Sequence, residues 1–508
     1  MYKAFLSILL KMLFKKYLYT FFAILLLFIA CKIMIMGIGL GSSNTKTILL
    51  MIFIIIVSSS KKAFYYFIIP LTVLYALYTP VGLTYGGVAY HYMASAFATD
   101  TNETYEFFKN IPIKNYFMAI AIIPFVIAYY KITTNLEIKM YRNKTILIVF
   151  IFIALFKQAP FKLFSDIKDS IKEVKKEQKI LEDLDKKTSW EKTKLINSKY
   201  DTYVLIIGES VRRDYLHAYG YSIPNTPFLS NSKGILIDGL TAPAKNTVAS
   251  LRLMLTQATT DSQPQYDKNF VDLANQSGFK TYWLSNQGYL GEHDTPLAAI
   301  AKKSSQTFFL KKGAYDSLNT SDFSLIPEFK KLITNKNKKL IVIHLYGSHP
   351  NACDRIEDYP KMLDKIDSKY DEINCYISSI KKTDAILQEI YTSLVNIEKK
   401  DNINFSMLYF ADHGLSSQQD GDSVVLRVGE KKQSYQVPLF MVNSDSIDQK
   451  TCKSFKSGLN FTNGIGSWLG ISNQQLPQYS LFDCKNDSNQ INHQTMLNNS
   501  ENDTIVNF

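Results

Sequence analysis

Residues 203–210 read Tyr-Val-Leu-Ile-Ile-Gly-Glu-Ser, a run of five apolar residues of strand length that ends at a glycine and a carboxylate. Two further apolar runs of strand length occur at 340–345 and 405–410, and helical stretches lie between them. Near-continuous apolar strands separated by helices indicate an α/β domain with a largely parallel central sheet, covered on both faces. Ligands of such sheets bind beyond the carboxyl ends of the strands, so the residues that follow these runs are the first candidates for chemistry.

The residues after the first and third runs have the chemistry of metal ligands. Glu209 follows the first run, and the pair Asp412-His413 follows the third. Two carboxylates and an imidazole suit zinc or a similar divalent cation. Each fragment alone has a plainer interpretation, because a Glu after a strand is often a cap or an ion-pair partner and Asp-His-Gly can be a turn.

A third fragment, Asn246-Thr-Val-Ala-Ser250, opens an amphipathic helix. A hydroxyl at a helix N-terminus lies in positive potential, which favours an attacking alkoxide and the phosphate that it would acquire. The sequence therefore offers Thr247 as a nucleophile, and the alternative is that Thr247 only caps the helix.

The net charge of +12 is concentrated in the N-terminal third, where residues 1–157 hold 15 Lys and Arg against 4 Asp and Glu. These charges flank apolar runs, so we expect a membrane protein rather than a nucleic-acid partner. Because a spanning helix needs about 20 apolar residues, we expect five spans, near 17–36, 43–60, 63–83, 115–131 and 145–160. The positive clusters all fall on one side, which places the N-terminus in the cytoplasm and the chain after about residue 160 outside.

This topology predicts four parts, namely a transmembrane domain over 1–160, an amphipathic connector of one or two helices over 161–200, a catalytic domain over 201–484 and a solvated polar tail over 485–508. Four cysteines in the external part would meet an oxidising compartment, which favours two disulfides. Of the three possible connectivities we expect pairing within each neighbourhood, Cys353 with Cys375 and Cys452 with Cys484.

The order of these fragments along the chain resembles the alkaline phosphatase superfamily. More closely, it is similar to the membrane-bound, sulfatase-like phosphoethanolamine transferases that modify lipopolysaccharide, and the resemblance covers nearly the whole chain. Its most specific stretches are Gly208-Glu-Ser-Val-Arg-Arg-Asp-Tyr-Leu-His-Ala-Tyr-Gly-Tyr221 with 225–227, then 247–254, 283–287, 344–349 and 412–414.

The resemblance implies a bacterial inner-membrane enzyme with a periplasmic catalytic domain. It also implies one zinc ion, in preference to manganese, held by Glu209, Thr247, Asp412 and His413. Thr247 would attack phosphatidylethanolamine, release diacylglycerol and carry phosphoethanolamine as phosphothreonine. Lipid A or the inner core of lipopolysaccharide would then accept the group.

Three further residues take expected roles from the same resemblance. His349 would bind the donor phosphate or act as acid and base, while Asn286 and Gln287 would line the donor site.

The chain departs from the family pattern at one place. Related enzymes usually carry another histidine, followed by glycine, some 12 to 15 residues after the Asp-His pair, whereas this chain reads Leu426-Arg-Val-Gly429. Arg427 could contact phosphate there but is a poor proton carrier. A phosphoglycerol transferase of the same superfamily and a non-catalytic membrane scaffold remain alternatives. The acceptor is also open, since lipid A, heptose, Kdo and a periplasmic glucan all fit.

Overall fold

The computed structural model describes residues 2–39, 43–85, 108–109, 111–138, 167–168, 171–172, 188–287, 296–310 and 320–508. The chain forms two compact units. The N-terminal unit comprises Met1–Met93 and Tyr105–Lys175, and the α/β unit comprises Ala94–Thr104 and Lys176–Phe508.

The N-terminal unit is built from apolar helices, namely α1 (Tyr2–Gly37), α2 (Asn44–Val57), α3 (Lys61–Ala63) continued by a π-helical turn (Phe64–Ile68), α4 (Ile69–Tyr85) and α7 (Ile113–Asn135). Within the described part of the chain, three stretches are long and apolar enough to cross a membrane: Phe14–Gly37, Lys61–Thr84 and Ile113–Asn135. They coincide with the first, third and fourth expected spans. The second corresponds to the shorter apolar helix Asn44–Val57, and the fifth, at 145–160, lies outside the described residues.

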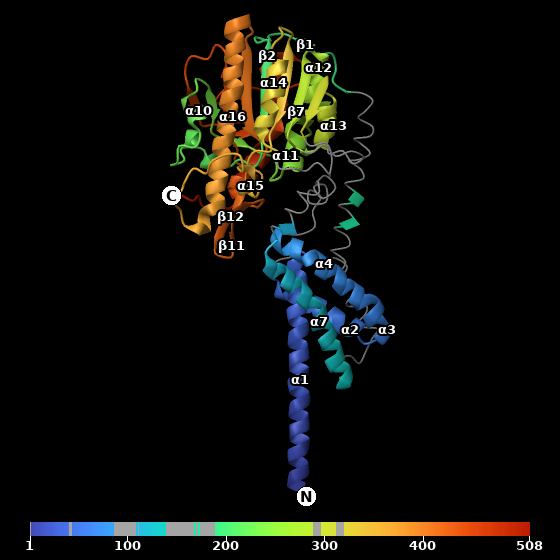
Figure 1. Ribbon diagram of the computed structural model, residues 1–508. Coiled ribbons are helices and arrows are strands. Elements are labelled where there is room, and N and C mark those ends of the chain that lie inside the picture. Colours follow the sequence, from blue (N-terminus) through green and yellow to red (C-terminus); the bar gives the residue numbers. More distant parts are fainter. Residues whose placement is uncertain are drawn as a thin grey trace. The chain divides into compact units, whose positions relative to one another are not determined.

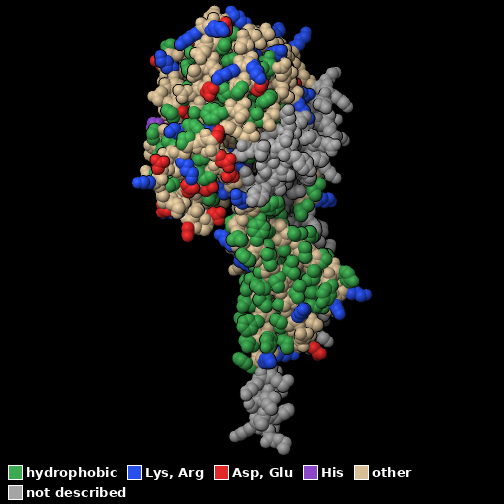
Figure 2. Space-filling model, in the orientation of Figure 1, with side chains coloured by type: hydrophobic (Ala, Val, Ile, Leu, Met, Phe, Trp, Pro, Cys, Tyr) green, Lys and Arg blue, Asp and Glu red, His purple; other side chains and the backbone are tan. Residues whose placement is uncertain are grey.

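The helices of this unit are apolar on their outer surface as well as between them. Tyr17, Leu77 and Phe117 are among the large side chains that remain exposed, and hydrophobic side chains cover the described part of the unit in Figure 2. A helix that is apolar all round suits a lipid environment. Between helices, a Cβ on Gly82 would lie 1.7 Å from the carbonyl oxygen of Gly37, so α1 and α4 touch backbone to backbone there.

The α/β unit is organised around an eight-stranded sheet with the order β14-β3-β13-β10-β2-β9-β7-β8. The run from β10 to β8 is parallel, while β13 lies antiparallel to β10 and to β3. The three apolar runs singled out in the sequence are the neighbouring strands β10, β2 and β9, which confirms the mostly parallel sheet. The strands are β2 (Thr202–Gly208), β3 (Ile235–Ile237), β7 (Lys280–Ser285), β8 (Gln306–Phe309), β9 (Lys339–His344), β10 (Phe405–Ala411), β13 (Leu439–Asn443) and β14 (Lys450–Cys452).

Helices cover both faces of this sheet. Side chains of β10 alternate between the faces: Phe405 contacts Tyr391 of α16, and Phe410 contacts Phe461 of α17. The long helix α16 runs along the sheet in Figure 1. The helices are α10 (Pro227–Asn231), α11 (Thr247–Met254), α12 (Phe270–Gln276), α13 (Pro296–Lys302), α14 (Ile326–Leu332), α15 (Ala352–Arg355), α16 (Asp371–Asp401), α17 (Phe461–Leu469) and α18 (Ile491–Asn499).

Short strand pairs lie outside the eight-stranded sheet. They are β1 (Lys194–Leu195) with β16 (Ile471–Ser472), β4 (Leu240–Thr241) with β15 (Lys456–Ser457), β5 (Thr256–Ala258) with β6 (Pro264–Asn269), and β11 (Ser416–Asp420) with β12 (Ser423–Arg427). Both expected disulfides, Cys353–Cys375 and Cys452–Cys484, are formed.

The two ends of the α/β unit were expected to be an amphipathic connector and a polar tail. Most of the connector over 161–200 lies outside the described residues, but the chain from 188 to 200 contains the strand β1 and no helix. The segment over 485–508, expected as a solvated tail, keeps most of its side chains at the surface but forms α18 and buries Asp487 and His493. Composition does not indicate this burial, since these polar side chains have buried partners, such as the Ser457 amide that donates to Asp487 Oδ2 at 2.8 Å.

Candidate active site

Strand register brings the first two candidate ligand segments together. β2 and β10 are parallel neighbours in which Gly208 is paired with Ala411. Glu209 and Asp412 therefore leave the sheet side by side, and the Asp412 amide donates to the Gly208 carbonyl at 3.1 Å. The carboxyl edge of the sheet thus places both carboxylates and His413 at one point.

Thr247 reaches the same point from the start of α11. Asn246, not Thr247, is the N-cap, because its side-chain oxygen accepts from the Ala249 amide at 2.9 Å. The Thr247 hydroxyl is therefore available for other contacts. It donates to Glu209 Oε2 at 2.9 Å and lies 3.4 Å from His413 Nε2.

The donor atoms of Glu209, Asp412 and His413 have the arrangement of a metal site. All three residues are buried, and one ligand atom of each lies within 4.8 Å of the others. Asp412 Oδ2 is buried and has no hydrogen-bond partner among the described residues. The Nδ1–H of His413 can donate to the Gly414 carbonyl at 2.7 Å, which turns the Nε2 lone pair toward the two carboxylates. A divalent cation fits these facing acceptors, and Thr247 Oγ1 could complete a tetrahedral set.

Charge is tightly balanced in this cluster. Burial and the neighbouring Glu209 carboxylate raise the pKa of Asp412 to about 8. Burial opposes ionisation of His413, but the carboxylates of Asp412 and Glu209 outweigh it and raise its pKa to about 9. Burial by itself would raise the pKa of Glu209. The hydrogen bond and the charge of His413 outweigh burial and hold this pKa below the usual range. A positive charge among these groups is therefore favoured, whether carried by protons or by a metal.

Two serines that the sequence analysis did not single out hold the candidate ligands in place. Ser210 has a positive φ of 59°, and its hydroxyl donates to Glu209 Oε1 at 2.6 Å while its amide donates to Asp412 Oδ1 at 2.9 Å. Ser250 donates to the Asp412 carbonyl oxygen at 2.6 Å. Only their positions in the sequence could have indicated these serines. Ser210 follows the candidate ligand Glu209, and Ser250 lies three residues after Thr247 on the same helix face.

The two candidate donor-site amides have different surroundings. Gln287 donates to Glu209 Oε2 at 3.2 Å and to the Leu345 carbonyl at 3.0 Å, so it touches the cluster. Asn286 is buried, and its amide nitrogen donates to the Thr320 carbonyl and to Asp322 Oδ1. Asp322 also accepts the amides of Tyr346 and Gly347. Asn286 therefore supports the loop that follows β9.

Comparison with known proteins agrees with this geometry. The sulfatase family profile matches residues 201–471, which include every residue of the cluster. The chain belongs to the sulfatase family. A Haemophilus influenzae protein provisionally named a phosphoethanolamine transferase is 47% identical over 368 residues, which cover 71% of this chain and 76% of that protein. Phosphoethanolamine transferase OpgE of Escherichia coli is 34% identical over 427 residues and 79% of each chain.

The structural comparison extends to the N-terminal helices. The integral membrane protein lipooligosaccharide phosphoethanolamine transferase A of Neisseria meningitidis matches with a TM-score of 0.58 at 14% identity, over 85% of this chain and 89% of that one. This match shows a shared fold. Together with the sequence relatives, it makes the chain a membrane-bound phosphoethanolamine transferase of the sulfatase family.

His349 lies close to the cluster of this transferase. Its charge contributes to the lowered pKa of Glu209, and its ring stacks on Tyr346 with 5.0 Å between centroids. The intervening Gly347 has a φ of 48°, and a Cβ there would lie 3.0 Å from the Glu209 amide nitrogen. The loop that carries His349 can therefore pack directly against the Glu209 backbone only with glycine at 347.

Arg427 lies on β12, in the segment where family members usually carry a histidine. Its guanidinium donates to the Leu426 carbonyl at 3.0 Å, and its charge acts on Glu372 of α16. Close to this segment, Lys245, two residues before Thr247, pairs with Glu430. The Lys245 ammonium, in the loop before Thr247, thus pairs with the segment after β12, where the family histidine is missing.

Proposed function

We propose that this enzyme transfers phosphoethanolamine from phosphatidylethanolamine to lipopolysaccharide, at lipid A or the inner core, through a phosphothreonine at Thr247. The observation that carries the proposal is the hydrogen bond from Thr247 Oγ1 to Glu209 inside the buried cluster with Asp412 and His413. A hydroxyl that does not cap its helix and faces metal-type ligands is suited to nucleophilic attack.

In the first step the Thr247 hydroxyl loses its proton to solvent, the Thr247 Oγ1–P bond forms and the bond from phosphorus to the diacylglycerol oxygen breaks. Glu209 Oε2 accepts the hydrogen bond of the hydroxyl and so aims the oxygen. Zinc, when bound by Glu209, Asp412 and His413, would lower the pKa of the hydroxyl and neutralise charge on the phosphoryl oxygens. Thr247 is the first residue of α11, so the amides at that helix terminus favour the phosphate group that it gains.

His349 is proposed to donate a proton to the departing diacylglycerol oxygen. An imidazole can donate and accept near pH 7, and Gln287, bonded to Glu209, would orient the donor headgroup. In the second step an acceptor oxygen forms a bond to phosphorus, the bond from phosphorus to Thr247 Oγ1 breaks, and Thr247 Oγ1 takes up a proton from solvent. Arg427 is proposed to contact acceptor phosphate, which replaces part of the role of the missing histidine.

The proposed location is the bacterial inner membrane, with five spans, a cytoplasmic N-terminus and the catalytic domain in the periplasm. The positive clusters beside the apolar runs support this orientation. The two disulfides also support it, since they persist in oxidising compartments.

The test incubates the full chain in detergent with phosphatidylethanolamine labelled in its headgroup, and in parallel with labelled phosphatidylglycerol. We expect label on the protein from the ethanolamine lipid, located at Thr247 by fragmentation and absent from Thr247→Ala. Label from the glycerol lipid alone would indicate a phosphoglycerol transferase. Thr247→Ala and Glu209→Ala variants that complement a deletion strain fully would indicate a scaffold.

The acceptor is identified separately by mass spectrometry of the envelope of a deletion strain. Loss of one phosphoethanolamine from lipopolysaccharide is the expected result. Unchanged lipopolysaccharide together with a deficit in a periplasmic glucan would refute the proposed acceptor while leaving the transfer chemistry intact.

A further inference from the structure

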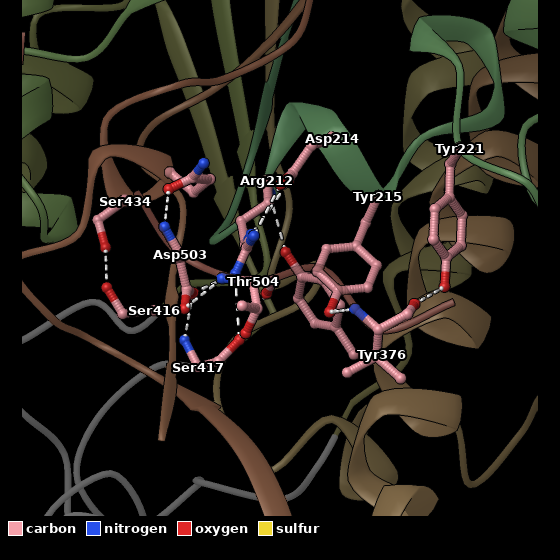
Figure 3. Close-up of polar contacts among 12 residues, drawn as sticks. Arg212, Asp214, Tyr215, Tyr221, Tyr376, Ser416, Ser417, Ser434, Asp503 and Thr504 are labelled. Atoms are coloured by element: carbon pink, nitrogen blue, oxygen red, sulfur yellow. Dashed lines mark hydrogen bonds and ion pairs between the residues drawn. The ribbon is translucent and has the colours of Figure 1, made fainter. Parts of the chain in front are cut away.

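The last residues of the chain pack against the segments that carry the candidate metal ligands. We call residues 501–508 the C-terminal strap. Asp503 Oδ2 accepts hydrogen bonds from Arg212 Nη1 at 2.6 Å and from the Ser417 amide at 2.5 Å, and Figure 3 shows Asp503 between these two residues. The Asp503 amide itself donates to Gln433 Oε1 at 2.8 Å.

The two partners of Asp503 belong to different ligand segments. Arg212 follows Glu209 by three residues, and Ser417 follows His413 by four. The Arg212 stem also packs against Gly414, where a Cβ would lie 3.1 Å from Arg212 Cγ. The Asp503 carboxylate therefore joins the Glu209 segment to the segment of Asp412 and His413. The contact lies away from the candidate ligand atoms.

Arg212 transmits this contact to the backbone beside Glu209. Its side chain is fully buried, and Asp214 and Asp503 are its ion-pair partners. Its amide donates to the Tyr376 hydroxyl at 2.8 Å, and that hydroxyl donates to the Ser210 carbonyl at 2.7 Å. The turn between Ser210 and Arg212 is thus held through its backbone by Tyr376 and through the Arg212 side chain by Asp214 and Asp503. Figure 3 shows the contact between Arg212 and Tyr376.

The strap is held along its length. The Val506 amide donates to the Tyr215 hydroxyl at 3.1 Å, the Tyr221 hydroxyl donates to the Val506 carbonyl at 2.8 Å, and Phe508 contacts Tyr370 edge to face. Asp503 is consequently presented to Arg212 by an ordered segment. Arg212 Nη1 also donates to Ser417 Oγ at 3.4 Å, but loss of the Asp503 charge would leave the buried guanidinium with Asp214 alone of its two ion-pair partners, which costs far more than loss of a surface pair.

We propose that Asp503 is a positioning residue of the metal centre. It holds the Glu209 segment and the Asp412-His413 segment at the separation that one cation requires, acting through Arg212 and the Ser417 amide. Residues behind metal ligands orient them, and their loss typically lowers metal affinity about 10- to 100-fold. The inference rests on the proposed function, because it presupposes a cation bound by Glu209, Asp412 and His413.

The test compares Asp503→Asn with Glu501→Gln in the full chain in detergent. Both variants remove one negative charge from the strap. Glu501 pairs with Lys431 at the surface, with 81% of its side chain exposed, so its loss should matter little. We measure zinc affinity by competition with a chelator, far below the melting temperature, and kcat and KM for phosphatidylethanolamine.

For Asp503→Asn we expect zinc affinity about 10- to 100-fold below wild type, a lower kcat and a KM within about twofold. Glu501→Gln should match wild type. A folded Asp503→Asn with wild-type zinc affinity overturns the inference, even if its melting temperature falls. If Asp503→Asn does not fold, Asp503→Glu is measured instead, which keeps the charge but displaces it by a methylene. Its zinc affinity should fall to a smaller extent. Wild-type zinc affinity in Asp503→Glu overturns the inference.

The same measurements separate this inference from the proposed function. If the wild type binds no zinc, or if Glu209→Gln binds zinc as tightly as the wild type, the metal centre itself is refuted. Wild type that binds zinc through Glu209, with Asp503→Asn unchanged, would refute only the role of Asp503.

Discussion

Zinc affinity of the full chain should rise steeply with pH below about pH 8. In the metal-free cluster, burial and Glu209 raise the pKa of Asp412 to about 8, and Asp412 and Glu209 raise that of His413 to about 9 against the effect of burial. Both groups hold protons at neutral pH and must lose them to bind a metal. The pKa of Glu209 is held below its usual range, so this carboxylate is ionised throughout and releases no proton.

The magnitude follows from counting protons. Each proton released on binding changes affinity tenfold per pH unit, which is about 1.4 kcal/mol. With one to two protons released, the Kd for zinc should fall about 10- to 100-fold between about pH 6.5 and 7.5, and should level off above about pH 9. Competition with a chelator of known proton affinity measures this slope.

Two variants test the assignment. Asp412→Asn removes one titrating ligand, so its affinity should drop and its slope should decrease by about one proton. His217→Gln changes an exposed histidine whose Nδ1 lies 3.1 Å from Ser230 Oγ, outside the cluster, and should keep the wild-type slope. A pH-independent Kd, or an unchanged slope in Asp412→Asn, would refute the reasoning.

Three further predictions concern the site and its support. Thr247→Val should abolish the mass increase of one phosphoethanolamine and lower turnover about 10⁴-fold or more, as loss of a nucleophile does elsewhere, whereas Thr247→Ser should retain part of the label seen by intact-mass spectrometry. Ser210→Gly keeps the positive φ but removes the hydroxyl that donates to Glu209 at 2.6 Å; a hydrogen bond to a charged group contributes about 1.5–3 kcal/mol, so kcat/KM should fall about 10- to 100-fold, and wild-type kinetics would contradict the role of this hydroxyl. Cys353→Ser with Cys375→Ser opens a bridge between residues 22 apart, which should destabilise the folded state by about 3 kcal/mol, and an unchanged urea midpoint would count against a structural role.

The sequence predicted that the Glu209 and Asp412 segments meet because parallel strands carry positional information. Apolar runs such as 203–207 identify strands, and parallel packing brings Glu209 and Asp412 to one edge. It left Thr247 open between cap and nucleophile, since a cap depends on which side chain turns back to the helix amides. The hydrogen bond that Asn246 accepts from the Ala249 amide shows that Asn246 is the cap, and the nucleophile role of Thr247 stays a prediction.

Other parts of the fold could not be predicted from local pattern. The polar segment over 485–508 has a composition typical of a solvated tail, yet its partners are buried groups far away in the chain, and composition does not record such pairs. Asn286 was grouped with Gln287 because the two are adjacent. Adjacent residues leave a strand end in different directions, so only Gln287 contacts Glu209.

The contact between Arg212 and Asp503 joins residues 291 positions apart. During synthesis, the Glu209, Thr247 and Asp412 segments emerge from the ribosome well before residue 503. Contacts of such long range form late in folding, because loop closure must precede them. We therefore expect the domain to collapse around its sheet first and to gain tight cation binding only after residues 501–508 have docked, so a chain truncated before residue 503 should be metal-poor.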